Sequence, residues 1–190
     1  MRRKDMAKQK GIIREYLECI AIALILAFFI ITFVVQSFVV DGSSMEPTLH
    51  NGQRLLVNKF IYHFRPPQPG DVIVFRYPAN PREDFIKRVI GVGGDTVGII
   101  DGQVLVNDHP LDEPYLIEPT YGNHLVEVPP GKVFVLGDNR NNSRDSRYPD
   151  VGLLTRRDII GKAAFIYWPP RDLGPVDARK NTSAVATEGG

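Results

Sequence analysis

The sequence Asp41-Gly42-Ser43-Ser44-Met45-Glu46-Pro47-Thr48 divides this chain into two parts of different character. Residues 19–40, before it, carry no charge, whereas short β-branched and aromatic runs separated by Gly, Pro, Asn and Asp follow it. Ser and Thr beside Gly and Pro are the usual composition of a turn. A serine that closely follows a long apolar run is also a candidate nucleophile at a membrane surface. The segment alone supports both interpretations, and the flanking sequence has to distinguish them.

The uncharged run at residues 19–40 predicts a transmembrane anchor. At about 1.5 Å per residue, a helix of this length spans roughly 30 Å, the hydrocarbon core of one bilayer. Residues 1–18 contain more basic than acidic side chains, namely Arg2, Arg3, Lys4, Lys8, Lys10 and Arg14 against Asp5, Glu15 and Glu18. This excess predicts a cytoplasmic N-terminus, a single membrane crossing and an extracytoplasmic remainder.

Two other interpretations of the apolar run are less favoured. A cleaved secretory signal also has a basic start, but its apolar middle usually covers only about 7–15 residues, and residues 36–40 offer no small-x-small cleavage site. A core helix of a soluble protein is disfavoured because uncharged runs of this length are rare there. We therefore expect an uncleaved anchor that contacts the lipid bilayer.

The remainder of the chain predicts a mainly β fold of antiparallel sheets. Seven runs rich in β-branched and aromatic residues are typical of strands: residues 55–57, 72–75, 85–90, 97–100, 103–106, 133–136 and 163–168. Between two of these runs, Asp101-Gly102 predicts a type I′ hairpin. Residues 41–95 and 132–170 are expected to form one β core, which would be catalytic if the candidate serine is a nucleophile.

Two segments are expected to lie outside this core. Residues 96–131 are richer in turns and prolines, and predict a small inserted lobe. Residues 171–190 carry few large apolar side chains, and predict a disordered tail.

Composition excludes several functions. The net charge of +1, with basic and acidic residues spread along the chain, gives no indication of nucleic-acid binding. A single cysteine, Cys19, cannot form an internal disulfide or a multi-thiolate zinc site. Neither a helical zinc-protease motif nor an S-x-x-K motif is present. We expect no metal and no cofactor, and the oligomeric state is left open.

Lys87 is a candidate general base. Strand alternation places Phe85, Lys87 and Val89 on one face and Ile86 and Arg88 on the other. An exposed lysine, with a pKa of about 10.4, is protonated near neutral pH, but burial among apolar groups lowers that pKa. A decrease of about three pH units costs roughly 4 kcal/mol, which requires a tightly packed site. The alternative is a strand lysine whose amine reaches water.

The polar loop, which we define as residues 137–147, follows an apolar strand and is dense in short hydrogen-bonding side chains and arginines. Such a loop can satisfy its own backbone, hold an ion pair between Asp145 and Arg147, and aim a hydroxyl at a neighbouring group. A polar surface loop without function is the alternative.

Together, these segments resemble the type I signal peptidases, membrane-bound Ser-Lys proteases that remove signal peptides from exported proteins. Residues 42–49 match the family's nucleophile box and residues 84–95 its lysine box, while residues 69–75 and 137–147 resemble two further boxes. The resemblance covers residues 16–168 in the family's order. It implies that Ser44 is the nucleophile and Lys87 the general base, that Ser143 helps to orient the lysine, and that Asp145 and Arg147 brace the site.

The resemblance also implies a substrate site. Signal peptides would bind with small residues in shallow pockets lined by Val40, Met45, Leu49, Phe85 and Ile86. Gly42 stands where some relatives carry a serine whose hydroxyl helps to bind the oxyanion, so backbone N–H groups, notably that of Ser44, would take that role here. Phe85 stands where many relatives have Tyr.

The implied mechanism needs only these side chains. Neutral Lys87 takes the proton of Ser44, the alkoxide attacks the peptide carbonyl, and water activated by Lys87 hydrolyses the ester. Ser44 lies only four residues after Val40, close to the surface where a membrane-spanning signal peptide exposes its cleavage site.

Three alternatives stay open. The four histidines lie outside the matching boxes, which makes a Ser-His-Asp triad possible but unsupported. A related Ser-Lys protease could cut other membrane-proximal segments or itself. A membrane-anchored β domain could bind or scaffold a partner without catalysis, with Ser44 and Lys87 as ordinary turn and strand residues.

Overall fold

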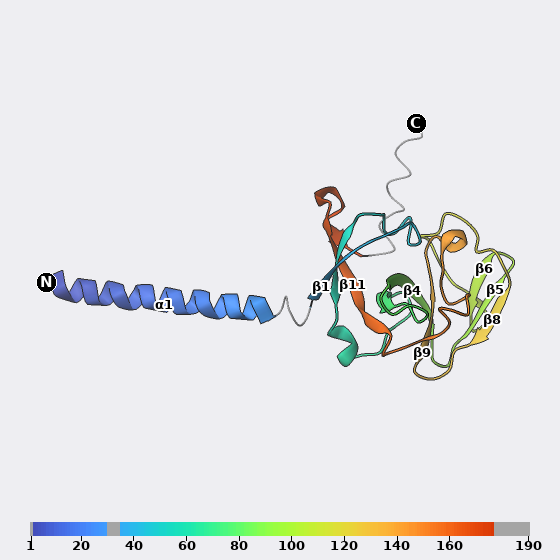
Figure 1. The fold of residues 1–190 in the computed structure, drawn as a ribbon, viewed down its shortest axis with the longest axis horizontal. Helices are drawn as coiled ribbons and strands as arrows, with labels where there is room; N and C mark the ends of the chain where they lie inside the picture. The colour runs from blue at the N-terminus through green and yellow to red at the C-terminus, as the bar shows by residue number, and fades with distance from the viewer. Residues whose placement is uncertain (1, 30–34, 177–190) are drawn as a thin grey trace, which may run out of the picture.

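The computed structural model of the chain describes residues 2–29 and 35–176, with side chains described in the first range for residues 15–28. Helix α1 (Arg2–Phe29) precedes a domain built from an eight-stranded and a four-stranded sheet (Figure 1). Every strand pair in both sheets is antiparallel. The expected mainly β fold with antiparallel sheets is confirmed. Among the described residues, no helix combines the length and the apolar character needed to cross a membrane.

The eight-stranded sheet has the order β1-β2-β11-β3-β4-β9-β10, with β12 paired to β11. Its strands are β1 (Val35–Val39), β2 (Arg54–Asn58), β3 (Val72–Arg76), β4 (Asp84–Val92), β9 (Lys132–Leu136), β10 (Leu154–Thr155), β11 (Ile159–Trp168) and β12 (Gly174–Pro175). Three short 3-10 helices join them: η2 (Ile61–His63), η3 (Arg140–Asn142) and η4 (Pro170–Asp172). Each run that predicted a strand in this region falls within one of these strands.

Strand β1 corrects the expected anchor at residues 19–40. Val35 to Val39 pair with β2, from Val35 opposite Asn58 to Val39 opposite Arg54. Val40 continues the pairing, because its N–H donates to the Gln53 carbonyl at 2.8 Å. β-branched and aromatic residues suit a half-buried strand as well as an apolar helix, so hydropathy alone could not separate the two. The uncharged run therefore ends as part of the β domain, and residues 30–34 lie outside the described residues.

The four-stranded sheet lies within the expected inserted lobe, residues 96–131. Its order is β7-β6-β5-β8, with β5 (Thr96–Ile100), β6 (Gln103–Val106), β7 (His109–Pro110) and β8 (His124–Glu127). Asp101 and Gly102 have φ values of 51° and 84°, as the predicted type I′ hairpin requires. Apolar side chains of β5 and β6 share one core cluster with residues of β4 and β9, including Val97, Val104 and Phe134. The inserted lobe thus packs directly on β4, which carries Lys87, and on β9, which leads into the polar loop.

The boundary of the tail also differs from the expectation of disorder from residue 171. Helix η4 and strand β12 cover residues 170–172 and 174–175, and the Val176 N–H donates to the Ala164 carbonyl at 3.1 Å. Asp172 accepts a hydrogen bond from Gln53 Nε2 at 2.7 Å. Backbone pairing along β11 orders residues up to Val176, although this segment carries few apolar side chains. Residues 177–190 lie outside the described residues.

The core of the eight-stranded sheet occupies both of its faces. On β3, Val72 and Val74 belong to one apolar cluster, whereas Ile73 and Phe75 belong to the other. Across the strand pair, Ile73 faces Lys87 and Phe75 faces Phe85. This register places the lysine on a buried face, as the alternation in its sequence predicts.

We predict that Gly161→Ala lowers the free energy of unfolding by about 1–3 kcal/mol, because the added methyl group overpacks the sheet. A methyl group at this position in β11 would lie 2.5 Å from the Asn58 carbonyl oxygen of β2. Gly98→Ala is the matched control, since its methyl group would meet no atom closer than 3.7 Å. Denaturant unfolding of the three proteins measures the difference, and equal stability of both variants would contradict the prediction.

Candidate active site

Ser44 and Lys87 form a hydrogen-bonded pair. Lys87 Nζ lies 2.8 Å from Ser44 Oγ and also donates to the Ile86 carbonyl at 2.8 Å. Lys87 comes from β4, near the middle of the sheet, and Ser44 from the turn that follows β1. The antiparallel order of the strands brings the two side chains together from positions 43 residues apart.

Burial gives the Lys87 amine the electrostatics of a base. The residue is only 3% exposed. Burial lowers its pKa from 10.5 to about 8, and the negative charges of Asp145 and Asp138 oppose part of that decrease. A neutral fraction of the amine is therefore accessible near neutral pH, and a neutral amine can accept a hydroxyl proton.

The polar loop holds the turn that carries Ser44. The Asn139 N–H donates to the Ser44 carbonyl at 3.1 Å, and Asn139 Nδ2 donates to the Ser43 carbonyl at 3.1 Å. Asn142 Nδ2 donates to Ser43 Oγ at 3.0 Å. The sequence pointed to the polar loop as a supporting network but did not assign these roles to Asn139 and Asn142. The two hydrogen bonds from Asn139 fix the backbone carbonyls on either side of the Ser44 side chain, and the one from Asn142 fixes the side chain of Ser43.

Ser143 contacts the site by packing. Its Oγ is buried and has no hydrogen-bond partner among the described residues, so the hydrogen bond expected to orient Lys87 is not formed here. Instead, Ser143 lies against Gly137, where an added methyl group would come within 2.2 Å of Ser143 Oγ and 2.5 Å of the Ser44 carbonyl oxygen. The missing side chain of Gly137 is therefore what allows Ser143 and Ser44 to approach. Sequence reasoning did not single out this glycine.

Two buried ion pairs flank the site. Arg147 Nε donates to Asp145 Oδ1 at 2.8 Å, which confirms the expected pair, and Asp145 also accepts from the Gly137 N–H at 3.1 Å. Arg88 Nε donates to Asp138 Oδ1 at 2.8 Å, on the side of β4 opposite Lys87. The sequence did not predict the Arg88–Asp138 pair, although strand alternation predicted that Arg88 and Lys87 lie on opposite faces of the strand.

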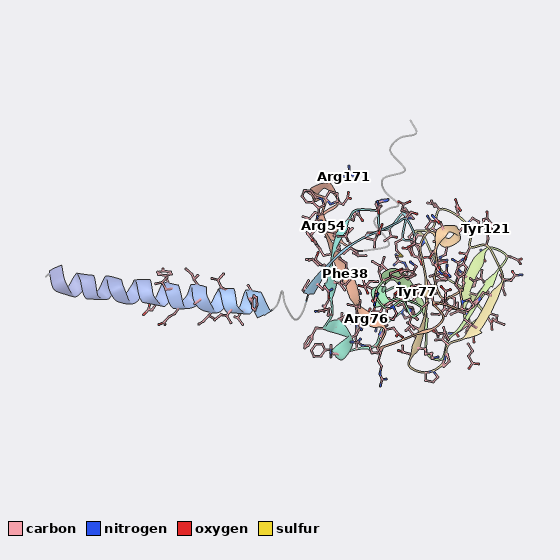
Figure 2. All side chains as sticks on the ribbon, in the orientation of Figure 1. Phe38, Arg54, Arg76, Tyr77, Tyr121 and Arg171 are labelled. Atoms are coloured by element: carbon pink, nitrogen blue, oxygen red, sulfur yellow. The ribbon has the colours of Figure 1, made fainter. Side chains whose placement is uncertain are left out.

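An active-site groove of about 370 Å³ opens at Ser44 and Lys87. Val40, Phe85 and Ile86, three of the predicted substrate residues, line it. Further lining residues are Phe38, which is labelled in Figure 2, Val39, Asp41, Leu55, Val74, Asp84 and Arg144. A larger cavity of about 720 Å³ surrounds Asp71 and Lys162 but includes neither Ser44 nor Lys87, so the chemistry of the side chains, and not size, identifies the site.

The other three predicted substrate residues do not line the groove. Met45 and Leu49 are 1% and 0% exposed and belong to the apolar core. Large apolar side chains on the inner side of the turn gain more by packing against that core than by facing the groove. Gly42 lies outside the groove lining with a φ of +91°, and its N–H donates to Asn51 Oδ1 at 2.9 Å. Gly42 therefore allows the turn to adopt a positive φ, which residues with a side chain rarely adopt.

Among the described residues, no group of three or more His, Cys, Asp or Glu side chains is gathered in a way that could hold a metal ion. In the same part of the chain, no histidine hydrogen-bonds to Ser44, whose hydroxyl partner is Lys87.

The Ser44 N–H has no acceptor in the described hydrogen-bond network, which leaves it free to donate to an oxyanion.

Comparison with known proteins identifies the family. The model of the family described as signal peptidase, peptidase S26, matches residues 13–168. A probable signal peptidase I-1 of Synechocystis is 44% identical over 165 residues, which cover 83% of each chain. Signal peptidase I S of Bacillus subtilis is 38% identical, over 89% of this chain and 96% of the relative. The chain belongs to the signal peptidase family of serine endopeptidases.

A solved structure is also similar. The crystal structure of a signal peptidase I from Enterococcus faecalis shares 33% sequence identity, covers 50% of this chain and 95% of that chain, and gives a TM-score of 0.46.

We predict that Lys87→Met raises the free energy of unfolding near pH 7, by up to about 3 kcal/mol, because it removes the cost of a buried amine whose pKa falls from 10.5 to about 8. Between these two pKa values the unfolded chain binds more protons at this position than the folded chain does, so wild-type stability rises with pH. The advantage of the variant should therefore shrink as pH rises through this window.

Denaturant unfolding of wild type and Lys87→Met at pH 6.5 and pH 10.5 measures this change. Lys132→Met, which replaces a half-buried lysine of β9, controls for the substitution itself. A stability difference for Lys87→Met that is the same at both pH values would contradict the burial of a neutralised amine.

Proposed function

We propose that this protein is a membrane-anchored serine endopeptidase that removes N-terminal signal peptides from exported preproteins through a Ser44–Lys87 dyad. The observation that carries the proposal is the 2.8 Å contact between Ser44 Oγ and the amine of a lysine that is 3% exposed. Membership of the signal peptidase family and the names of the relatives support the substrate class.

The proposed reaction uses the dyad twice. Neutral Lys87 accepts the Ser44 hydroxyl proton as Oγ attacks the scissile carbonyl carbon, and the Ser44 N–H donates to the resulting oxyanion. The protonated amine then passes its proton to the leaving nitrogen as the peptide bond breaks, which leaves an ester on Ser44. In the second half, Lys87 takes a proton from water, and the resulting hydroxide attacks the ester carbon. The bond between Ser44 Oγ and that carbon then breaks, Lys87 returns the proton to Ser44 Oγ, and the signal peptide leaves with a new carboxyl terminus.

The active-site groove suits an extended peptide. It runs between residues 38–41, at the end of β1, and residues 84–87, at the start of β4. A substrate strand between these two segments would present alternate side chains to the groove wall. Val40, Phe85 and Ile86 occupy much of that wall, which favours small substrate side chains beside Ser44.

The membrane anchor is proposed from the sequence and from the exposure of α1. The side chains of Ile20, Leu24 and Phe28 are 54%, 65% and 69% exposed in the described residues. Exposed apolar side chains along one helix are expected to contact lipid or another apolar partner. We propose a single crossing within the part of residues 19–40 that precedes β1, with residues 1–18 in the cytoplasm and the β domain outside it.

The first test is cleavage of an exported precursor in detergent. Wild type is expected to cleave after a small-x-small sequence, and Ser44→Ala and Lys87→Met are each expected to lose at least about a thousandfold in kcat/KM. Ser37→Ala is the matched control, because Ser37 Oγ hydrogen-bonds with Tyr167 Oη at 2.6 Å and does not contact Lys87. It should retain most of the activity.

The folding of each variant is checked by circular dichroism before assay. Cleavage that survives Lys87→Met would reject the dyad and direct attention to another base. A wild type that cleaves none of several precursors, and whose Ser44 resists a serine-acylating probe, would favour a membrane-anchored binding domain.

The second test addresses the anchor. In membranes from expressing cells, the full chain is expected to stay in the pellet after an alkaline carbonate wash, whereas a chain that starts at residue 35 should be released. Protease added to the outside of intact spheroplasts should digest the β domain. Release of the full chain by carbonate, or protection of its β domain, would contradict the proposed arrangement.

A further inference from the structure

The inserted lobe contacts the polar loop through a buried ion pair. The guanidinium of Arg140, in η3 of the polar loop, donates from Nη1 to Glu113 Oε2 at 2.8 Å and from Nη2 to Glu113 Oε1. The side chains of Arg140 and Glu113 are 1% and 7% exposed. Glu113 comes from the segment between β7 and β8, so this pair links the inserted lobe to the loop that holds Ser44.

Arg140 makes two further hydrogen bonds, one to the inserted lobe and one within the polar loop. Nη1 also donates to Thr120 Oγ1 at 2.9 Å, which is a second contact with the inserted lobe. Nε donates to the Gly137 carbonyl at 3.0 Å. The guanidinium is therefore held by Glu113 and Thr120 on one side, and on the other side it holds one backbone carbonyl of the polar loop.

That carbonyl belongs to Gly137, the residue against which Ser44 and Ser143 pack. Gly137 lies against both the Ser44 carbonyl and Ser143 Oγ, with no room for a side chain. Its N–H donates to Asp145 and its carbonyl accepts from Arg140. The position of Gly137 is thus set from both sides, by Asp145 within the polar loop and by the inserted lobe through Arg140.

Glu113 also reaches the second arginine near the site. Tyr115 Oη donates to Glu113 Oε1 at 2.7 Å, and the Tyr115 ring lies 4.2 Å from the guanidinium carbon of Arg88. One carboxylate therefore connects the inserted lobe to both Arg140 and the neighbourhood of the Arg88–Asp138 pair. A buried ion pair adds little stability compared with apolar packing, but the loss of one partner leaves a costly unpaired charge. Such a pair is best suited to fixing a geometry.

We propose that Glu113 is a positioning residue, through which the inserted lobe fixes Gly137 and so holds Ser44 in contact with Lys87. This inference rests on the proposed Ser44–Lys87 reaction. It assigns to the inserted lobe a role in the geometry of the active site, although none of its side chains lines the active-site groove.

The test is Glu113→Gln, which keeps the shape of the side chain and removes its charge. We expect kcat for precursor cleavage to fall about tenfold with KM nearly unchanged, because a small displacement of reacting groups lowers the rate more than binding. Arg65→Gln is the matched control. It breaks another ion pair, with Asp71, whose other side-chain contacts are with Tyr62, Gln68 and Lys162 and not with the polar loop, and it should reduce stability without changing kcat.

A second readout follows Lys87 directly and needs no cleavage. The rate at which a small acylating reagent modifies the Lys87 amine is measured against pH by mass spectrometry in wild type, Glu113→Gln and Arg65→Gln. A loosened site admits water, so the pKa of Lys87 should rise from about 8 toward 10.5 in Glu113→Gln alone. The charged groups near this amine, Asp138 and Asp145 together with Asp41, Asp84 and Arg144 of the groove, are the same in all three proteins.

Thr120→Val provides a milder variant in case Glu113→Gln does not fold, since it removes one hydrogen bond to Arg140 and no charge. It should change kcat and the Lys87 titration in the same direction, by less. Unchanged kcat and unchanged Lys87 titration in the folded variants would overturn the positioning role. A wild type that cleaves nothing, while Glu113→Gln still shifts the Lys87 titration, would reject the proposed function and leave the positioning role intact.

Discussion

The contact between the Lys87 amine and the Ser44 hydroxyl is the constraint on which the rest of this structure depends. A lysine that is 3% exposed is costly to keep, and its pKa is lowered to about 8 because β3 and β4 bury it beside apolar side chains. That cost is sustained only by dense packing, which explains why a site of two side chains needs an eight-stranded sheet around it. The two faces of the sheet have different tasks, since Lys87 lies on one and the Arg88–Asp138 pair on the other.

Three buried ion pairs surround the serine turn: Arg88–Asp138, Arg147–Asp145 and Arg140–Glu113. Replacing such pairs with apolar side chains is often neutral for stability, so their value lies in the single geometry that they permit. Here they converge on Gly137 and Asp138, the two residues that follow strand β9. The polar loop is thereby held by several buried contacts, although it contains no regular structure beyond one turn of η3.

The sequence predicts much of this arrangement where the signal is local. Strand alternation around Lys87, the Asp101-Gly102 hairpin and the Asp145–Arg147 pair each involve residues close together in the chain, and the structure contains all three. Strand β1 could not be predicted, because hydropathy does not distinguish a strand of Val and Phe from the end of an apolar helix. Met45 and Leu49 were expected to line the substrate pocket but lie in the core. The family motif could not predict this, because it does not tell which way a side chain points. Glu113 lies 27 residues from Arg140, and no local pattern connects them.

Because the Lys87 amine becomes a base only through burial, the unfolded chain lacks that base. In the unfolded chain this lysine is solvated and charged, and the serine hydroxyl has no neighbouring group that could take its proton. Proteolytic power of the proposed kind would therefore not exist in the newly made polypeptide. It would arise only once β3, β4 and the polar loop have closed around the amine, so that folding itself creates the base.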